Sequence, residues 1–173
     1  MSSSISHEIK HRKKAKDVFI TPPELAKSHI DMVSNMTSLK KWYDPFKNSG
    51  NYFNQFPDNG NTHKWSEILE GKDFFEYNDE TEVICSNPPY SMIDPVLKKS
   101  IEINPKIISY LLCFHHLTTK RLELMENNGY TLVKMSLTKV FKWYGMSCIV
   151  IWEKDSNKQS VLGYDRKVWR EGK

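Results

Sequence analysis

The chain has 173 residues, of which 39% are hydrophobic and 27% are charged, and its formal net charge is +4. This length and composition suit one globular domain with a hydrophobic core, and no apolar run is long enough to cross a bilayer. The N-terminus lacks an apolar signal region, so we expect an intracellular, soluble protein (cytoplasmic, or nuclear in a eukaryote) without a membrane partner.

Three cysteines are spread along the chain, and each lies within an apolar segment: Cys85, Cys113 and Cys148. This placement predicts buried free thiols and argues against a framework of disulfides. Cys113 with His115 and His116 is the only cluster of residue types that bind metals, and it lacks a second pair of ligands. We therefore expect no metal site.

Residues 1–16 read as a flexible tail that is rich in serine at first and basic afterwards. The basic part includes Lys13 and Lys14 and contains one acidic residue, Glu8. Such an arm could lie along the phosphates of a nucleic acid and would make binding sensitive to salt. A solvated tail without a ligand explains the same residues equally well.

The first helix is predicted to begin near residue 21. Thr21 and Glu24 have the spacing of a capping box, and Pro22 suits the first helical position. Two further helices are predicted from Asp94 and from Thr119, where apolar residues recur at helical spacing. The predicted strands lie at 42–44, 62–68, 81–85, 107–114, 131–141 and 146–153.

Strands that alternate with helices predict an α/β fold of three layers with a largely parallel sheet. The last two predicted strands are joined by the short segment 142–145, so the last strand is expected to be antiparallel. This organisation divides the chain into a basic N-terminal tail (1–16), one α/β domain (17–153) and a polar C-terminal tail (154–173).

The sharpest chemical signal is Ser86-Asn87-Pro88-Pro89-Tyr90, which directly follows a predicted buried strand. Ligands of α/β sheets gather at the carboxyl ends of strands. The Asn87 side-chain oxygen and the Pro88 carbonyl can accept both protons of an exocyclic aromatic amine, which would make its nitrogen more nucleophilic. Pro88 and Pro89 keep the turn extended, and Tyr90 can stack on a flat base. The pattern predicts a site that activates an aromatic amine.

The sequence at positions 87–90, Asn-Pro-Pro-Tyr, resembles the catalytic motif of the class I amino-methyltransferases. Members of this family use S-adenosylmethionine to methylate adenine at its 6-amino group or, in a smaller branch, a glutamine of release factors. The resemblance implies a Rossmann-like class I methyltransferase fold over 17–153, S-adenosylmethionine as the cofactor, and the segment 87–90 as the catalytic motif.

The segment 44–50, Asp-Pro-Phe-Lys-Asn-Ser-Gly, resembles the cofactor loop of this family, which is usually Asp-Pro-Phe-x-Gly-x-Gly. The final glycine lets the backbone approach the methionine part of the cofactor. The resemblance implies cofactor contacts in this loop and in other segments. They are Phe19, Thr21, Pro22, Asp44, Pro45, Phe46, Asn48, Gly50, Glu67, Ile68, Asp73, Phe74 and Asn87.

The resemblance also implies roles for members of this set. The segment from Phe19 to Pro22 would contact the carboxylate of the cofactor, as the N-terminus of a helix can. Glu67 would bind the two ribose hydroxyls. Asp73 would accept a hydrogen bond from the adenine amine of the cofactor, and Phe74 would pack on that adenine.

One position departs from the family pattern, because Asn48 stands where a glycine is usual. Asparagine tolerates a positive φ better than most residues, so the turn can persist, but its side chain would crowd the cofactor. A catalytically inactive nucleic-acid-binding or scaffold subunit that kept the fold is therefore an alternative to an enzyme.

The expected substrate is adenine in DNA, because the motifs look most like those of compact adenine-DNA methyltransferases of phages and mobile elements. Adenine in RNA is the next alternative, and a release-factor glutamine is the third. Trp143 and Tyr144 lie where this family packs an aromatic on the flipped base, while Lys13 and Lys14 could contact phosphates. The chain resembles a bare catalytic core, so a partner subunit or a second copy could supply specificity.

Overall fold

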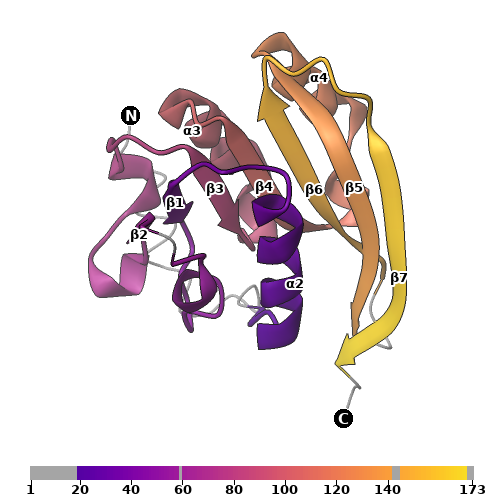
Figure 1. Ribbon diagram of the computed structural model, residues 1–173, viewed down its shortest axis with the longest axis horizontal. Helices are drawn as coiled ribbons and strands as arrows, with labels where there is room; N and C mark the ends of the chain where they lie inside the picture. The colour runs from indigo at the N-terminus through magenta and orange to yellow at the C-terminus, as the bar shows by residue number, and fades with distance from the viewer. Residues whose placement is uncertain (1–18, 59, 142–144, 171–173) are drawn as a thin grey trace.

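The computed structural model describes residues 19–58, 60–141 and 145–170. Over these residues the chain forms a seven-stranded sheet in the order β2-β1-β3-β4-β6-β5-β7 (Figure 1). The strands are β1 (Lys41–Asp44), β2 (Thr62–Trp65), β3 (Val83–Ser86), β4 (Ile107–Cys113), β5 (Tyr130–Phe141), β6 (Ser147–Lys154) and β7 (Val161–Arg170). The α-helices are α2 (Pro23–Ser34), α3 (Ile93–Ile103) and α4 (Thr119–Asn127).

The sheet is mostly parallel, as the sequence predicts. β1 pairs in parallel with β2 and β3, and β3 pairs in parallel with β4. β6 lies antiparallel between β4 and β5, which confirms the predicted antiparallel strand. All seven residues of β4 are buried, as expected for a continuous apolar strand in the middle of a sheet.

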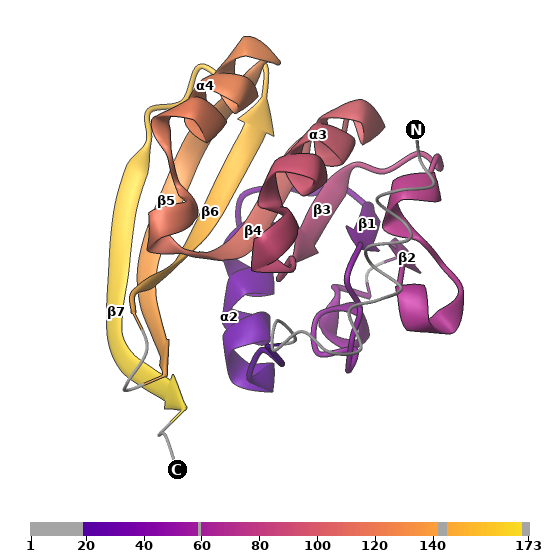
Figure 2. The same cartoon turned by 180° about the vertical axis from the view of Figure 1, so that it is seen from behind.

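Helices cover both faces of the sheet. α2 lies on one face, and α3 and α4 lie on the other (Figures 1 and 2). Ile30 and Val33 of α2 belong to one core cluster, while Val96 and Leu97 of α3 and Met125 of α4 belong to a second. Amphipathic helices that bury one face against each side of a sheet produce the predicted three-layer α/β architecture.

The start of α2 differs from the sequence prediction. Pro22 is the N-cap residue rather than the first helical residue, and no side chain caps the helix. The predicted capping box of Thr21 and Glu24 is therefore wrong. The Thr21 hydroxyl instead accepts a hydrogen bond from the side chain of Asn87, which is distant in sequence.

The strands also differ from the prediction in two places. β2 ends at Trp65, and the chain then turns through the short 3₁₀ helix Ile68–Glu70, so the strand predicted over 62–68 is too long. The predicted C-terminal tail contains β7, which pairs in parallel with β5. Val161 and Leu162 are exposed at this edge, so β7 lacks the apolar alternation that identifies a half-buried strand.

The three cysteines are free and buried, as predicted. In the described part of the chain, no helix has the length and the apolar character that crossing a bilayer requires.

Candidate active site

Four parallel strands bring their carboxyl ends to one edge of the sheet (Figure 1). Side chains from segments far apart in sequence meet at such an edge. The groups that end or soon follow these four strands are Asp44, Glu67, Asn87 and the 3₁₀ turn Phe114–His116. This edge is therefore the candidate active site.

Asp44 ends β1 and is fully buried. Its Oδ1 accepts hydrogen bonds from Ser86 Oγ at 2.6 Å and from the Phe46 backbone N–H at 3.2 Å. Its Oδ2 accepts one from the Phe53 backbone N–H at 3.2 Å. Burial raises the pKa of Asp44 to about 7, although these hydrogen bonds oppose the rise. Asp44 thus anchors the loop after β1 to the end of β3.

The loop after β1 turns through two residues with positive φ. Asn48 has a φ of 47° and Gly50 one of 84°. The backbone N–H of Asn48 donates to Glu67 Oε2 at 2.9 Å. Asn48 is exposed, so its side chain projects from the loop. The predicted tolerance of asparagine for this conformation is confirmed, and the turn persists without the usual glycine.

Two acidic residues begin 3₁₀ turns next to this loop. Glu67 is half-buried, and its Oε1 accepts from the Leu69 backbone N–H at 3.2 Å. Asp73 is 9% exposed, and its Oδ1 accepts from the Phe75 backbone N–H at 2.9 Å. Backbone donors therefore orient both carboxylates.

Apolar side chains lie beside these acids. Phe74 is buried, and its ring meets that of Phe46 edge to face with centroids 5.1 Å apart. Ile68, which follows Glu67, packs against the core cluster that contains Phe74. Carboxylates beside aromatic rings can bind a flat heterocycle with polar substituents.

Asn87 follows β3, and its amide has one defined orientation. Nδ2 donates to the Phe19 carbonyl at 3.2 Å and to Thr21 Oγ1 at 3.1 Å. Because a carbonyl only accepts, this contact fixes the NH₂ end of the amide and turns Oδ1 the other way. Among the side chains that the structure describes, Asn87 Oδ1 is the one buried polar atom without a hydrogen-bond partner. A buried acceptor without a partner costs free energy, so its presence calls for an explanation.

Aromatic side chains surround Tyr90 in the turn that follows. Its ring stacks with Phe19 at a centroid distance of 6.1 Å and lies 5.2 Å from His116. His115 lies 4.3 Å from His116, and Phe114 is 48% exposed. Sequence reasoning did not assign this histidine-containing turn to the site. The turn directly follows a buried strand, as the Asn-Pro-Pro-Tyr segment does. This position is the feature of the sequence that could have identified the turn as part of the site.

Proteins of known structure share this fold. A Pyrococcus horikoshii protein assigned as an RNA methyltransferase superposes with a TM-score of 0.62 at 13% identity, over 91% of this chain and 98% of its own. A Listeria monocytogenes protein assigned as a class I S-adenosylmethionine-dependent methyltransferase superposes with a TM-score of 0.65 at 15% identity. The match covers 98% of this chain and 71% of the Listeria chain. The chain has the class I methyltransferase fold.

A third structure with the methyltransferase fold is a type I restriction-modification methyltransferase subunit from Streptococcus thermophilus. Its TM-score is 0.57 at 13% identity, over 84% of this chain and 46% of its own. No protein-family model and no curated protein matches the sequence. The structural likeness confirms the predicted Rossmann-like fold.

The methyltransferase fold brings together several of the predicted site residues that the structure describes. The segment of Phe19 and Thr21 meets Asn87, and the loop of Asn48 meets Glu67. Within residues 19–58, 60–141 and 145–170, no group of three or more His, Cys, Asp or Glu side chains could hold a metal ion. The predicted substrate contacts that lie outside the described residues are Lys13, Lys14, Trp143 and Tyr144.

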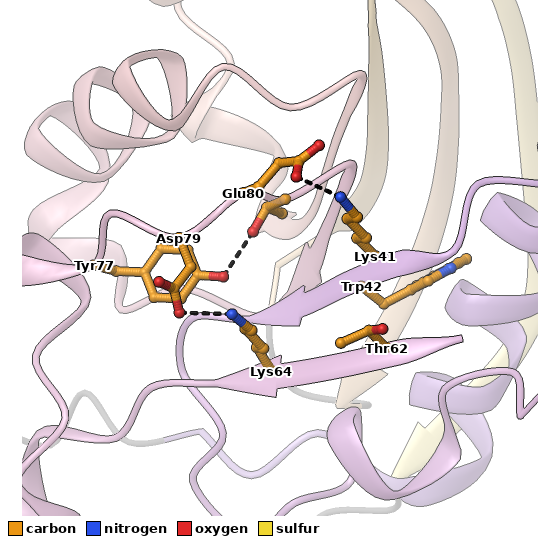
Figure 3. A pocket seen from close by; sticks show the side chains of 8 residues that line it. Lys41, Trp42, Thr62, Lys64, Tyr77, Asp79 and Glu80 are labelled. Atoms are coloured by element: carbon orange, nitrogen blue, oxygen red, sulfur yellow. Dashed lines mark hydrogen bonds and ion pairs between the residues drawn. The ribbon is translucent and has the colours of Figure 1, made fainter. Parts of the chain in front are cut away.

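A pocket of about 160 Å³ lies away from this site of the methyltransferase fold (Figure 3). The pocket adjoins the first residues of β1 and β2. It therefore lies at the amino ends of these strands, whereas the candidate active site lies at their carboxyl ends. Lys64 Nζ pairs with Asp79 Oδ2 at 2.7 Å, and Lys41 pairs with Glu80. The charged groups around this pocket neutralise one another, so we assign it no chemistry.

Asp44 should make the stability of the methyltransferase fold depend on pH. Its carboxyl binds a proton more tightly when folded, because burial raises its pKa from 3.8 to about 7. The resulting stabilisation is fully present below pH 3.8 and is lost as the pH rises through about 7. Urea unfolding across this pH range should show that, as the pH rises, the free energy of unfolding of the wild type falls relative to that of Asp44→Asn. Parallel pH profiles for the two proteins would contradict this role of Asp44.

Proposed function

We propose that this chain is an S-adenosylmethionine-dependent methyltransferase that acts on the 6-amino group of adenine in a nucleic acid. The observation that carries the proposal is Asn87 Oδ1, a buried acceptor turned away from Phe19 and Thr21 at the carboxyl end of β3. A substrate amine would satisfy this acceptor with one of its protons and leave its nitrogen available for attack.

The mechanism follows from the groups around Asn87. Its Oδ1 would accept one proton of the amine, and the Pro88 backbone carbonyl would accept the other. These bonds localise the nitrogen lone pair and stabilise the positive charge that develops on it. Tyr90, next to Phe19 and His116, offers a ring face to the adenine. The bound cofactor supplies an electrophilic methyl group on a sulfonium. The methylated nitrogen, which still carries two protons and a positive charge, then loses one proton to water, so no strong base is required.

The residues after β1 and β2 fit the adenosyl part of the cofactor. Glu67, oriented by backbone donors, would accept from the ribose hydroxyls. Asp73 would accept from the adenine amine, while Phe74 and Phe46 would form an apolar wall. The backbone near Gly50 would lie along the methionine part, and the start of α2 would face its carboxylate.

Asn48→Gly should tighten the binding of S-adenosylmethionine by about tenfold, because it removes an exposed side chain that projects from the loop where the cofactor is proposed to bind. Calorimetric titration measures this change in Kd. Asn104→Gly is the matched control, since Asn104 also has a positive φ, 58°, but lies at the end of α3. An unchanged or weaker affinity in Asn48→Gly would show that Asn48 does not obstruct the cofactor.

DNA is the nucleic acid that we place first, because of the resemblance to compact adenine-DNA methyltransferases. RNA follows, and a release-factor glutamine is third. The structural neighbours support both nucleic acids without separating them, since one is assigned to RNA and another belongs to a restriction-modification system. The latter neighbour is itself a subunit, which supports the proposal that a partner or second copy contributes specificity.

A catalytically inactive binding or scaffold subunit is the second candidate, and Asn48 in the cofactor loop is the observation that favours it. Calorimetric titration of the chain with S-adenosylmethionine separates the two. The enzyme proposal predicts saturable binding that weakens in variants of Glu67. Absence of binding at millimolar cofactor would favour the scaffold.

A further inference from the structure

The 3₁₀ turn Phe114–His116 exposes aromatic side chains beside the proposed catalytic motif. Phe114 is 48% exposed and His115 is also exposed, although both follow the fully buried strand β4. Exposed apolar residues are common on protein surfaces, so exposure alone does not indicate a function. The position of the turn is more informative, because β4 pairs in parallel with β3, the strand that precedes Asn87. The turn and the catalytic motif therefore lie at the same edge of the sheet.

A row of rings connects the catalytic motif with this turn. The centroid of the Tyr90 ring lies 5.2 Å from that of His116, and the His116 centroid lies 4.3 Å from that of His115. Phe19 also stacks with Tyr90, with centroids 6.1 Å apart. Successive planar side chains can each stack on a base of a single strand, whatever the sequence. Aromatic groups thus continue beyond Tyr90, the residue proposed to hold the target adenine.

Hydrogen bonds fix the backbone of the turn at both ends. The N–H of Phe114 donates to the Met146 carbonyl at 2.9 Å. Arg121 Nη1 donates to the His116 carbonyl at 2.9 Å, and its Nε donates to Asp94 Oδ1 at 2.7 Å. Because the backbone is already held, an exposed ring on this turn loses little conformational entropy when a ligand stacks on it.

Positive charge surrounds the same anchor. The ion pair of Arg121 with Asp94 brings the first turns of α4 and α3 together. Lys120 precedes Arg121, Lys98 lies one helical turn after Asp94, and both lysines are exposed. The Arg121 hydrogen bond is the main cause that lowers the pKa of Asp94, and the charges of the two lysines add to it. Three cations around one carboxylate leave a field that suits the phosphates of a nucleic acid.

We propose that the turn Phe114–His116 binds the base next to the target adenine, that Phe114 stacks on this base, and that the substrate strand is unpaired at both positions. Flipping moves one target base out of a duplex and leaves its neighbours in the stack. A ring that stacks on a neighbour therefore requires a single strand, a loop or a bulge. This role rests on the proposed function, which places the target adenine on Tyr90, and it narrows the substrate to unpaired nucleic acid.

Substitutions of Phe114 test the stacking, and its exposure makes them compatible with folding. Fluorescence anisotropy at one fixed salt concentration measures the binding of labelled single-stranded DNA with one central adenine, and of the RNA of the same sequence. Phe114→Ala should raise the Kd for the strand that binds better by about tenfold, as for loss of one base stack. Phe114→Leu keeps an apolar side chain without a ring and should lose a similar factor, whereas Phe114→Tyr should keep the wild-type Kd.

Leu162→Ala is the matched control for the loss of exposed apolar surface. Leu162 is 64% exposed on β7, which β6 and β5 separate from β4. This variant should bind both strands as the wild type does. The Kd for S-adenosylmethionine, measured by calorimetry, should be the same in Phe114→Ala and the wild type.

A duplex of the same sequence tests the requirement for an unpaired strand. It should bind the wild type more weakly than the single strand, and Phe114→Ala should not change its Kd. A wild-type Kd for both single strands in Phe114→Ala, or an equal loss for duplex and single strand, would overturn the inference, even if the wild type methylates adenine. Affinity for a single strand that depends on Phe114, in a wild type that methylates nothing, would instead overturn the proposed function and leave the stacking turn intact. A wild type that binds neither strand would overturn both.

Discussion

Asn87→Ala is expected to lower kcat for methyl transfer by about 10²- to 10³-fold, the usual effect of removing one group that stabilises transition-state charge. Its Oδ1 is buried and unpaired, so a substrate amine would be its first strong partner. The interaction strengthens as positive charge develops on the nitrogen, so the loss should appear in kcat. Binding of S-adenosylmethionine, measured by calorimetry, should persist.

The control for Asn87→Ala must separate the loss of Oδ1 from the loss of contacts to the segment before α2. Asn51→Ala provides it, because the Asn51 amide anchors the Thr21 carbonyl but is not a proposed acceptor for the amine. Asn51→Ala should lower kcat by less than about tenfold, as for one ordinary hydrogen bond. A wild-type rate in Asn87→Ala would show that the proposed mechanism is wrong.

Asp73→Asn is expected to weaken S-adenosylmethionine binding by about ten- to a hundredfold, as for loss of a hydrogen bond to a charged group. The asparagine oxygen can still accept from the Phe75 backbone N–H, so the 3₁₀ turn should persist. Its NH₂ group, however, would replace a carboxylate oxygen and oppose the adenine amine with a donor. Calorimetric titration gives the change in Kd directly.

Asp79→Asn is the matched control for this substitution. Asp79 is more exposed than Asp73 and pairs with Lys64 in the pocket at the other edge of the sheet. The same chemical change there should leave the Kd of the cofactor at its wild-type value. Equal dissociation constants for the wild type and Asp73→Asn would remove Asp73 from the cofactor site.

Much of the fold could be predicted because its signals are local. The continuous apolar run of β4 predicts a strand buried on both faces, and α4 (Thr119–Asn127) begins at Thr119, as predicted. β7 could not be predicted in the same way. It has exposed apolar side chains, and its ordered position depends on backbone pairing with β5.

The site was predictable to the extent that its residues form short motifs. Asn87 and the loop after β1 follow strands directly, so the sequence places both at the edge of the candidate site. The hydrogen bond between Thr21 and Asn87, by contrast, joins residues 66 positions apart, and His29 meets Ser109 80 positions away. Tertiary packing determines those contacts, and it also overrides the local capping pattern at Thr21.

Methyl transfer from radiolabelled S-adenosylmethionine tests the central proposal most directly. Unmethylated duplex DNA, single-stranded DNA and total RNA are offered in parallel to the wild type and to Asn87→Ala, and mass spectrometry identifies the modified base. The proposal predicts label as 6-methyladenine in one pool, with DNA first, and its near loss in Asn87→Ala. Label at another position, equal label in the variant, or no label in any pool would contradict it.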